Sequence, residues 1–258
     1  MLKIWNLFYI IRIKVSVQYP HRYEPVNSSH KKGKGELLMK SFNKTICALF
    51  LTISGVFASL FAVAMFQQYL LASFPIILRM ILAILVHWII LIVPLIMMKF
   101  TKITLQDIGF EKENFAKQIL IGIGLALAMS LVLTVIPILL GFKDFVAGNQ
   151  FQSIWQFAYY FVYDIAAIGF VEEFIFRGCL YNLLLKVKDS LWFAILVSSI
   201  LFGLYHIVNG LSIQMITTTF IGILFCICRQ KIKNCTLLSL ILMHGIYDWL
   251  ILVWGSLL

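Results

Sequence analysis

Seven apolar segments constrain the fold of this 258-residue chain more than any other feature. A helix that crosses the hydrocarbon core of a bilayer needs about 20 predominantly apolar residues. Segments of about this length occupy residues 45–71, 76–98, 117–140, 153–174, 190–207, 211–228 and 236–256. Within lipid every backbone polar group must be bonded inside the protein, so such segments form helices. The sequence therefore predicts an all-α fold, a polytopic bundle of about seven membrane helices within residues 45–258.

The composition supports a membrane protein and argues against a soluble or nucleic-acid-binding one. Hydrophobic residues make up 62% of the chain and charged residues only 12%, whereas soluble domains are closer to half apolar and a quarter charged. The net charge of +10 comes from Lys and Arg that flank the apolar segments and form no basic face. The cysteines form no CxxC pair, so we interpret them as small hydrophobic residues. We expect membrane lipid as a partner and no nucleic acid.

The distribution of Lys and Arg predicts the orientation of the bundle. If the N-terminus lies inside, the outer side carries only Arg79 and Lys143. The inner loops and helix ends then carry Lys40, Lys44, Lys99, Lys102, Lys112, Lys117, Arg177, Lys186, Lys188, Arg229, Lys231 and Lys233. Because cytoplasmic loops are enriched in Lys and Arg, we predict a multi-pass plasma-membrane protein with its N-terminus inside. Residues 177–189 are predicted to form a short interfacial helix.

Residues 1–44 precede the first apolar segment and differ from the rest of the chain. They are basic and contain no apolar run long enough to span a bilayer. One interpretation is a cationic cytoplasmic arm. The other, which we favour, is that translation begins at Met39, because Gly35-Glu36 can be encoded by a purine-rich sequence like a bacterial ribosome-binding site. The second interpretation points to a bacterial cell membrane.

Ionisable side chains within the spans mark the candidate site, because such groups are costly at bilayer depth and usually functional. Glu173 and Arg177 are one helical turn apart, with the acid N-terminal to the base, which favours an ion pair. Glu172 points about 100° away from that pair and is left free to act. The alternative is a helix end at the headgroups, where charges are common. His87 is interpreted as a core histidine, and Asp164 receives no chemical role.

Two later spans carry pairs of side chains at helical spacing. Phe202 and His206 share one helix face, and so do His244 and Asp248. Taken alone, His206 fits a packing or interfacial histidine. The second pair alone fits a His–Asp hydrogen bond that joins two helices. Each pair therefore has a structural alternative, and only their combination with the acidic pair makes a specific pattern.

The ordered pattern Glu-Glu-x-x-x-Arg, Phe-x-x-x-His and His-x-x-x-Asp resembles the CAAX-protease and bacteriocin-processing (CPBP, or Abi) family of intramembrane proteases. The resemblance covers about residues 150–250. It implies an intramembrane endopeptidase that hydrolyses a membrane-bound peptide or small membrane protein. By position, Glu172 would activate water, and His206 would help to hold that water. His244 and Asp248 would stabilise the oxyanion.

The resemblance also implies a supporting role for Glu173, Arg177 and Phe202. At the position of Asp248 the family often has Asn, which can donate an N–H, whereas an ionised Asp can only accept hydrogen bonds. Asp248 would therefore have to be protonated, orient His244, or ligate a metal.

Two mechanisms and two other function classes stay open. Glu172, His206 and His244 could form a Zn²⁺ site with one open position. We favour metal-free water activation, because the chain has no His-Glu-x-x-His and the ligands would come from three helices. The non-enzymatic alternative is a bacteriocin self-immunity or receptor-modulating protein that acts by binding. A proton-coupled transporter is disfavoured, because the sequence has no evident inverted repeat.

Overall fold

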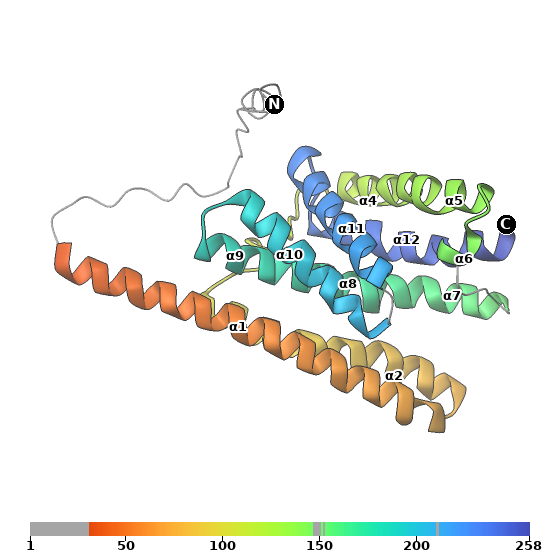
Figure 1. The fold of residues 1–258 in the computed structure, drawn as a ribbon, viewed down its shortest axis with the longest axis horizontal. Coiled ribbons are helices and arrows are strands. Elements are labelled where there is room, and N and C mark those ends of the chain that lie inside the picture. Colours follow the sequence, from red (N-terminus) through yellow and green to blue (C-terminus); the bar gives the residue numbers. More distant parts are fainter. Residues whose placement is uncertain (1–30, 147–150, 152, 210–211) are drawn as a thin grey trace, which may run out of the picture. The chain divides into compact units, whose positions relative to one another are not determined.

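The computed structural model describes residues 31–146, 151, 153–209 and 212–258, and every regular element within them is helical (Figure 1). By its internal contacts the chain divides into residues 1–36 and 37–258, and the second unit contains the helical bundle. The predicted basic arm lies mostly outside the described residues, although helix α1 (Lys31–Tyr69) already covers its last part. The translation start at Met39 stays a prediction.

Among the described residues, six helical segments are long and apolar enough to cross a membrane. They are Ser41–Ser73, Ile76–Thr101, Phe115–Leu139, Ile154–Val187, Ile213–Lys231 and Leu237–Leu257. A seventh apolar helix, α10 (Leu191–Tyr205), has only 15 residues. The all-α polytopic bundle is thus confirmed, with six spans and one shorter helix at the predicted segments. Its orientation, with the N-terminus inside, stays a prediction.

Several of these spans are composed of consecutive helical pieces. The first contains most of α1 and η1 (Leu71–Ser73). The second joins α2 (Ile76–Trp88), η2 (Ile89–Leu91) and α3 (Ile92–Thr101). The third joins α4 (Phe115–Ser130), η3 (Leu131–Val135) and α5 (Ile136–Leu139), and the short α6 (Lys143–Val146) follows it. The remaining elements are η6 (His206–Asn209), α11 (Ser212–Lys231) and α12 (Leu237–Leu257).

The fourth span is longer than predicted and carries the acidic pair near its middle. It joins α7 (Ile154–Tyr163), η4 (Asp164–Gly169), α8 (Phe170–Glu173), η5 (Phe174–Leu180) and α9 (Tyr181–Val187). Both η4 and η5 are π-helical, a geometry frequent at functional sites. Residues 177–187, predicted as a short interfacial helix, are helical but continue this span as η5 and α9, and residues 171–181 are buried; the interfacial position of the segment stays a prediction. Arg177 is therefore an interior residue and not a loop charge.

Polar residues and proline set the starts of several helices. Pro75 precedes α2, where its missing N–H costs no helical hydrogen bond. Ser190 caps α10, because its hydroxyl accepts a hydrogen bond from the Phe193 N–H. A reciprocal capping box of Thr236 and Ser239 begins α12. These caps satisfy N–H groups that a helix leaves unpaired at its start.

Helix α12 lies between α4 on one side and the fourth span on the other, and α10 packs along α11 (Figure 1). Glycines allow the closest approach. A Cβ atom at Gly245 would lie 2.5 Å from the carbonyl oxygen of Asp164, and one at Gly169 would lie 2.7 Å from that of Ile241. Small residues let membrane helices approach closely. Here they bring the helix of His244 against the helix of the acidic pair.

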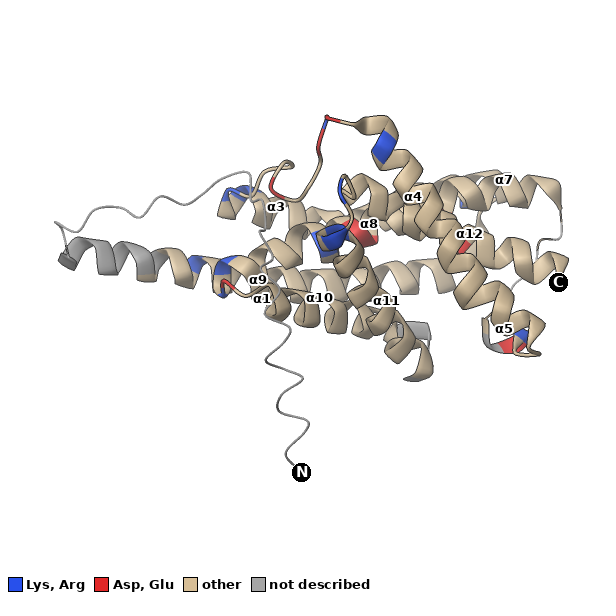
Figure 2. Ribbon diagram, turned by 90° about the horizontal axis from the view of Figure 1, so that it is seen from above, with Lys and Arg blue, Asp and Glu red and all other residues tan. Residues whose placement is uncertain are grey.

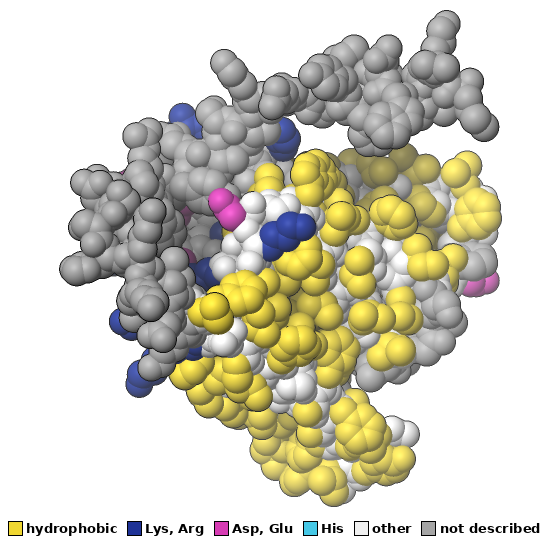
Figure 3. Space-filling model, turned by 60° about the vertical axis from the view of Figure 1, so that its left-hand side comes forward, with side chains coloured by type: hydrophobic (Ala, Val, Ile, Leu, Met, Phe, Trp, Pro, Cys, Tyr) yellow, Lys and Arg dark blue, Asp and Glu magenta, His cyan; other side chains and the backbone are white. Residues whose placement is uncertain are grey.

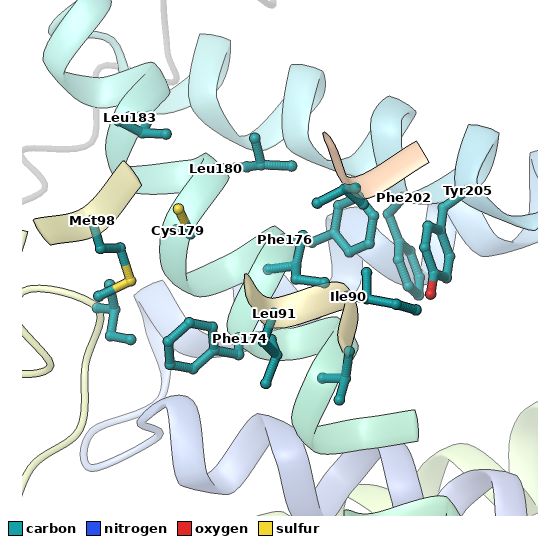
Figure 4. Close-up of a cluster of buried hydrophobic side chains, with 14 of the residues drawn as sticks. Ile90, Leu91, Met98, Phe174, Phe176, Cys179, Leu180, Leu183, Phe202 and Tyr205 are labelled. Atoms are coloured by element: carbon teal, nitrogen blue, oxygen red, sulfur yellow. The ribbon is translucent and has the colours of Figure 1, made fainter. Parts of the chain in front are cut away.

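The largest hydrophobic cluster joins α1, the second span, the fourth span and α10 (Figure 4). It includes Leu60 of α1 and Ile90 of η2. The ring of Phe176 packs edge-to-face against Phe202, with ring centroids 5.2 Å apart, and against Tyr205, at 5.3 Å. This packing holds the rings of Phe202 and Tyr205 in place beside the helix that carries the acidic pair.

The outer surface is largely apolar, as a lipid environment requires. Figure 3 shows a face covered mostly by hydrophobic side chains. Most Lys and Arg residues lie in loops and near helix ends, whereas a charged group lies inside the bundle beside α8 (Figure 2). That interior group is where the chain departs from the pattern of a simple membrane helix bundle, and it forms the site described next.

Candidate active site

A cavity of about 1100 Å³ lies among α1, α2, the fourth span, α10, α11 and α12. Five of the residues singled out by the sequence line it: Glu172, Phe202, His206, His244 and Asp248. They come from the fourth span, from the α10–η6 segment and from α12, so only the packing of the bundle brings them together. Asp164, which received no role, is buried next to Gly245 and is not among the lining residues.

Glu172 presents an unpaired carboxylate oxygen to this cavity. The residue is 4% exposed, and its Oε2 atom has no hydrogen-bond partner among the described residues. That oxygen lies 3.9 Å from His206 Nε2 and 3.8 Å from His244 Nε2. Both distances are too long for a direct hydrogen bond, and polar atoms beyond 3.5 Å apart can be bridged by one water molecule. The three side chains therefore have the spacing of a water-binding site.

His206 directly follows α10, as the first residue of η6, and is held by the last turn of that helix. Its Nδ1 atom lies 2.9 Å from the carbonyl oxygen of Phe202. A carbonyl oxygen can only accept, so Nδ1 must be the donor. In the neutral ring Nε2 then carries the lone pair. This assignment leaves an acceptor on His206 that faces Glu172, so a water between them can donate one hydrogen to each.

His244 is flanked by carboxylates on both sides. Its Nδ1 lies 2.8 Å from Glu173 Oε1, and its Nε2 lies 3.3 Å from Asp248 Oδ2. The first contact requires a proton on Nδ1 if Glu173 is ionised. The second becomes a hydrogen bond only if His244 carries a second proton or Asp248 is protonated. Of the three roles left open for Asp248, both a protonated carboxyl and the orientation of His244 match this contact.

Glu173 and Arg177 lie behind the cavity and form a buried ion pair. Arg177 Nη1 is 2.9 Å from Glu173 Oε1, the same oxygen that contacts His244, and the two side chains are 1% and 0% exposed. The guanidinium also lies over the Phe202 ring at 4.1 Å from its centroid and over Phe225 at 5.1 Å, distances typical of cation–π contacts. Glu173 therefore links Arg177 to His244, a connection that the one-dimensional pattern did not indicate.

Phe202 is the centre of the aromatic packing around the two histidines. Its ring centroid is 4.9 Å from that of His206 and 5.8 Å from that of His244, both edge-to-face. Figure 4 shows Phe202 beside Tyr205 of the same helix. These contacts restrict the imidazole orientations without using their nitrogen atoms.

His87, Gln67 and Tyr205 also line the cavity, although the sequence analysis did not assign them to the site. His87 was interpreted as a core histidine, yet its Nδ1 is 3.4 Å from both Gln67 Nε2 and Tyr163 Oη. Gln67 belongs to α1 and Tyr163 to α7, so a search for companions on one helix could not find them. Tyr205 is 3% exposed, and its hydroxyl has no partner among the described residues. Its place directly before His206 in the sequence is the signal that could have assigned Tyr205 to the site.

Arg229 also has a role that the charge pattern hid, since it was counted as a loop charge. Its guanidinium donates to the carbonyl oxygen of Arg177 at 2.7 Å and to that of Ile108 at 2.9 Å. The first acceptor belongs to the π-helical segment η5. Arg229 thus ties α11 to the turn that carries Arg177 and to the loop before the third span.

The side chains of the described residues also bear on whether a metal could bind. Among them, no group of three or more His, Cys, Asp or Glu residues is arranged to hold a metal ion. Glu172, His206 and His244, the Zn²⁺ ligands left open by the sequence, are not such a group in this arrangement.

The family model "Type II CAAX prenyl endopeptidase Rce1-like" matches residues 154–250, which include every residue of the candidate site named from the sequence. No curated protein and no solved structure matched the chain.

Proposed function

Because residues 154–250 form an Rce1-like type II CAAX prenyl endopeptidase domain, and so belong to a peptidase family of membranes, we propose that this chain is an intramembrane endopeptidase that uses water activated by Glu172. The substrate class that we propose is a membrane-associated peptide or small membrane protein. One observation carries the proposal. A buried carboxylate oxygen without a protein partner faces two imidazole nitrogens at 3.8 and 3.9 Å in a large cavity.

The first step is attack of water on the peptide carbonyl. A water between Glu172 and His206 donates one hydrogen to each, which leaves an oxygen lone pair free for the carbonyl carbon. As the C–O bond forms, Glu172 accepts one proton and becomes neutral. Proton transfer to a positioned carboxylate of this kind is general base catalysis.

The second step breaks the C–N bond. The protonated Glu172 returns its proton to the departing nitrogen, so the products are a carboxylic acid and an amine, and the site regains its initial charge. The negative charge on the tetrahedral intermediate needs a donor. His244 offers one from Nε2 when both ring nitrogens carry protons, and Glu173 and Asp248 then flank the charged ring.

The test of this proposal is the substitution Glu172→Gln, which keeps the shape of the side chain and removes the base. We expect cleavage of membrane peptides, measured by mass spectrometry of the products, to fall by about 10²-fold or more. The matched control is Glu113→Gln, which makes the same change at an exposed position. We expect the control to cleave at the wild-type rate and wild-type cleavage to persist with a chelator.

The outcomes separate this proposal from its rivals. Full cleavage by Glu172→Gln protein that is correctly inserted would refute glutamate activation. Loss of cleavage with the chelator would instead favour metal chemistry. A biological phenotype that survives Glu172→Ala and His206→Ala would favour a self-immunity or receptor-modulating role by binding.

A further inference from the structure

A second cavity of about 370 Å³ lies at one end of the bundle, between the α1–α2 turn, the first turns of α2 and α7. Arg79 is the cationic residue in its wall, and none of the described residues that line it is acidic. The other polar and aromatic side chains of the wall are Gln67, Trp155, Gln156, Tyr159, Tyr160 and Tyr163. The proposed catalytic chemistry uses neither this cavity nor Arg79.

The charge of Arg79 is not neutralised within the described part of the chain. It forms no ion pair there with an acidic side chain, and its Nε atom is buried without an acceptor. Its Nη2 atom reaches only two backbone carbonyl oxygens, those of Ala72 at 3.4 Å and Phe74 at 3.3 Å. A guanidinium offers five N–H donors in a planar fork that suits the oxygens of a phosphate. Arg79 therefore has unused capacity for an anion.

Tyrosines of α7 form another part of the cavity wall. The rings of Tyr159 and Tyr160 are 5.3 Å apart, and those of Tyr159 and Tyr163 are 5.6 Å apart. The Tyr159 hydroxyl is held by donation to the carbonyl oxygen of Met80 at 3.3 Å. Tyr and Trp are enriched at membrane–water interfaces, because one end of the side chain is apolar and the other polar. This wall suits a headgroup at the level of the interface.

The surroundings of the cavity are apolar and exposed. Ile76 and Trp155 line the cavity and are 51% and 46% exposed, and their neighbours Ile77 and Ile154 are 71% and 84% exposed. In a membrane protein such side chains face acyl chains. A ligand of this cavity therefore meets an unpaired cation at one end and lipid-facing side chains at the other. This combination suits an anionic amphiphile.

We propose that this cavity, here called the Arg79 pocket, binds the headgroup phosphate of an anionic phospholipid, with the acyl chains along Ile77 and Ile154. Arg79 donates to the phosphate oxygens, and the tyrosine wall packs against the glycerol part. Gln67 lines both this pocket and the candidate active site. A bound lipid therefore occupies the space directly behind the wall that carries Gln67 and His87.

The test measures lipid binding to the purified full-length protein by native mass spectrometry. Phosphatidylglycerol, which is anionic, is titrated against phosphatidylcholine, which carries the same phosphate with a compensating cation. We expect Arg79→Gln to bind phosphatidylglycerol about fivefold more weakly than wild type, the effect of one surface cation on an anionic lipid. Arg79→Lys keeps the charge without the fork and should retain part of the binding. Lys143→Gln, which removes the other cation predicted on that side, should bind as wild type does.

Three outcomes would overturn the proposal. One is wild-type affinity of Arg79→Gln for phosphatidylglycerol. Another is an equal loss in Lys143→Gln, which would reduce the effect to general surface charge. The third is displacement of the lipid by a peptide with a free C-terminal carboxylate but not by its amide, which would reassign Arg79 to a peptide ligand. All three readouts are independent of peptidase activity, so failure here would not bear on the role of Glu172.

Discussion

Glu173 is predicted to have two functions: it neutralises Arg177 and it orients His244. Both contacts use the same oxygen, at 2.9 Å from Arg177 Nη1 and 2.8 Å from His244 Nδ1. The substitution Glu173→Met removes both contacts and leaves a cation with 1% exposure without its counter-charge. The double substitution Glu173→Met/Arg177→Met removes the stranded charge as well, but it still leaves His244 without its acceptor. The two variants therefore separate stability from activity.

The magnitudes follow from the burial of the pair. Breaking a buried ion pair by removing one partner costs about 3–5 kcal/mol, which for a chain of this size corresponds to a fall in Tm of roughly 6–20 °C. In the double variant the remaining cost is that of one unsatisfied buried N–H, about 1–3 kcal/mol. We expect thermal unfolding in detergent at one fixed heating rate to show a large loss for Glu173→Met and a clear recovery in the double variant. We expect neither to cleave at the wild-type rate.

Two results would refute this reasoning. An unchanged Tm for Glu173→Met would show that Arg177 finds another source of compensation. Wild-type cleavage by the double variant would show that His244 needs no acceptor at Nδ1. If one oxygen of Glu173 serves both Arg177 and His244, the double variant should recover Tm relative to Glu173→Met but should not recover cleavage.

Two further substitutions test the packing and the cavity wall. Gly245→Ala places a methyl group 2.5 Å from the carbonyl oxygen of Asp164, so we expect a lower Tm and slower cleavage. Gly124→Ala, where nothing lies within 4 Å, should leave both unchanged, and equal effects in the two variants would contradict the close-crossing argument. Tyr205→Phe removes a buried hydroxyl without a partner among the described residues. If that hydroxyl donates to the tetrahedral intermediate, the rate constant for cleavage should fall by roughly 10-fold to 10²-fold with an unchanged Tm, and an unchanged rate would exclude it from the reaction.

Spacing within one helix was predictable because a helix fixes which side chains share a face. The contact between Glu173 and Arg177 and the pairing of His244 with Asp248 both follow that rule. The extension of the fourth span through residues 177–187 was not predicted, for a related reason. The charge of Arg177 indicated an interface, whereas an interior partner removed the need for one.

The sequence by itself determined the helices, the membrane class and the order of the motifs, because apolar length and a fixed helical repeat are local properties. Only the tertiary structure decided which motifs meet. The contact of His244 with Glu173, the link from Arg229 to the Arg177 carbonyl, and the approach of Gln67 to His87 each join different spans. Such contacts depend on how closely helices cross, and in this bundle glycines at the crossing of α12 with the fourth span allow that approach. The repeat of side chains along one helix does not determine how closely that helix crosses another.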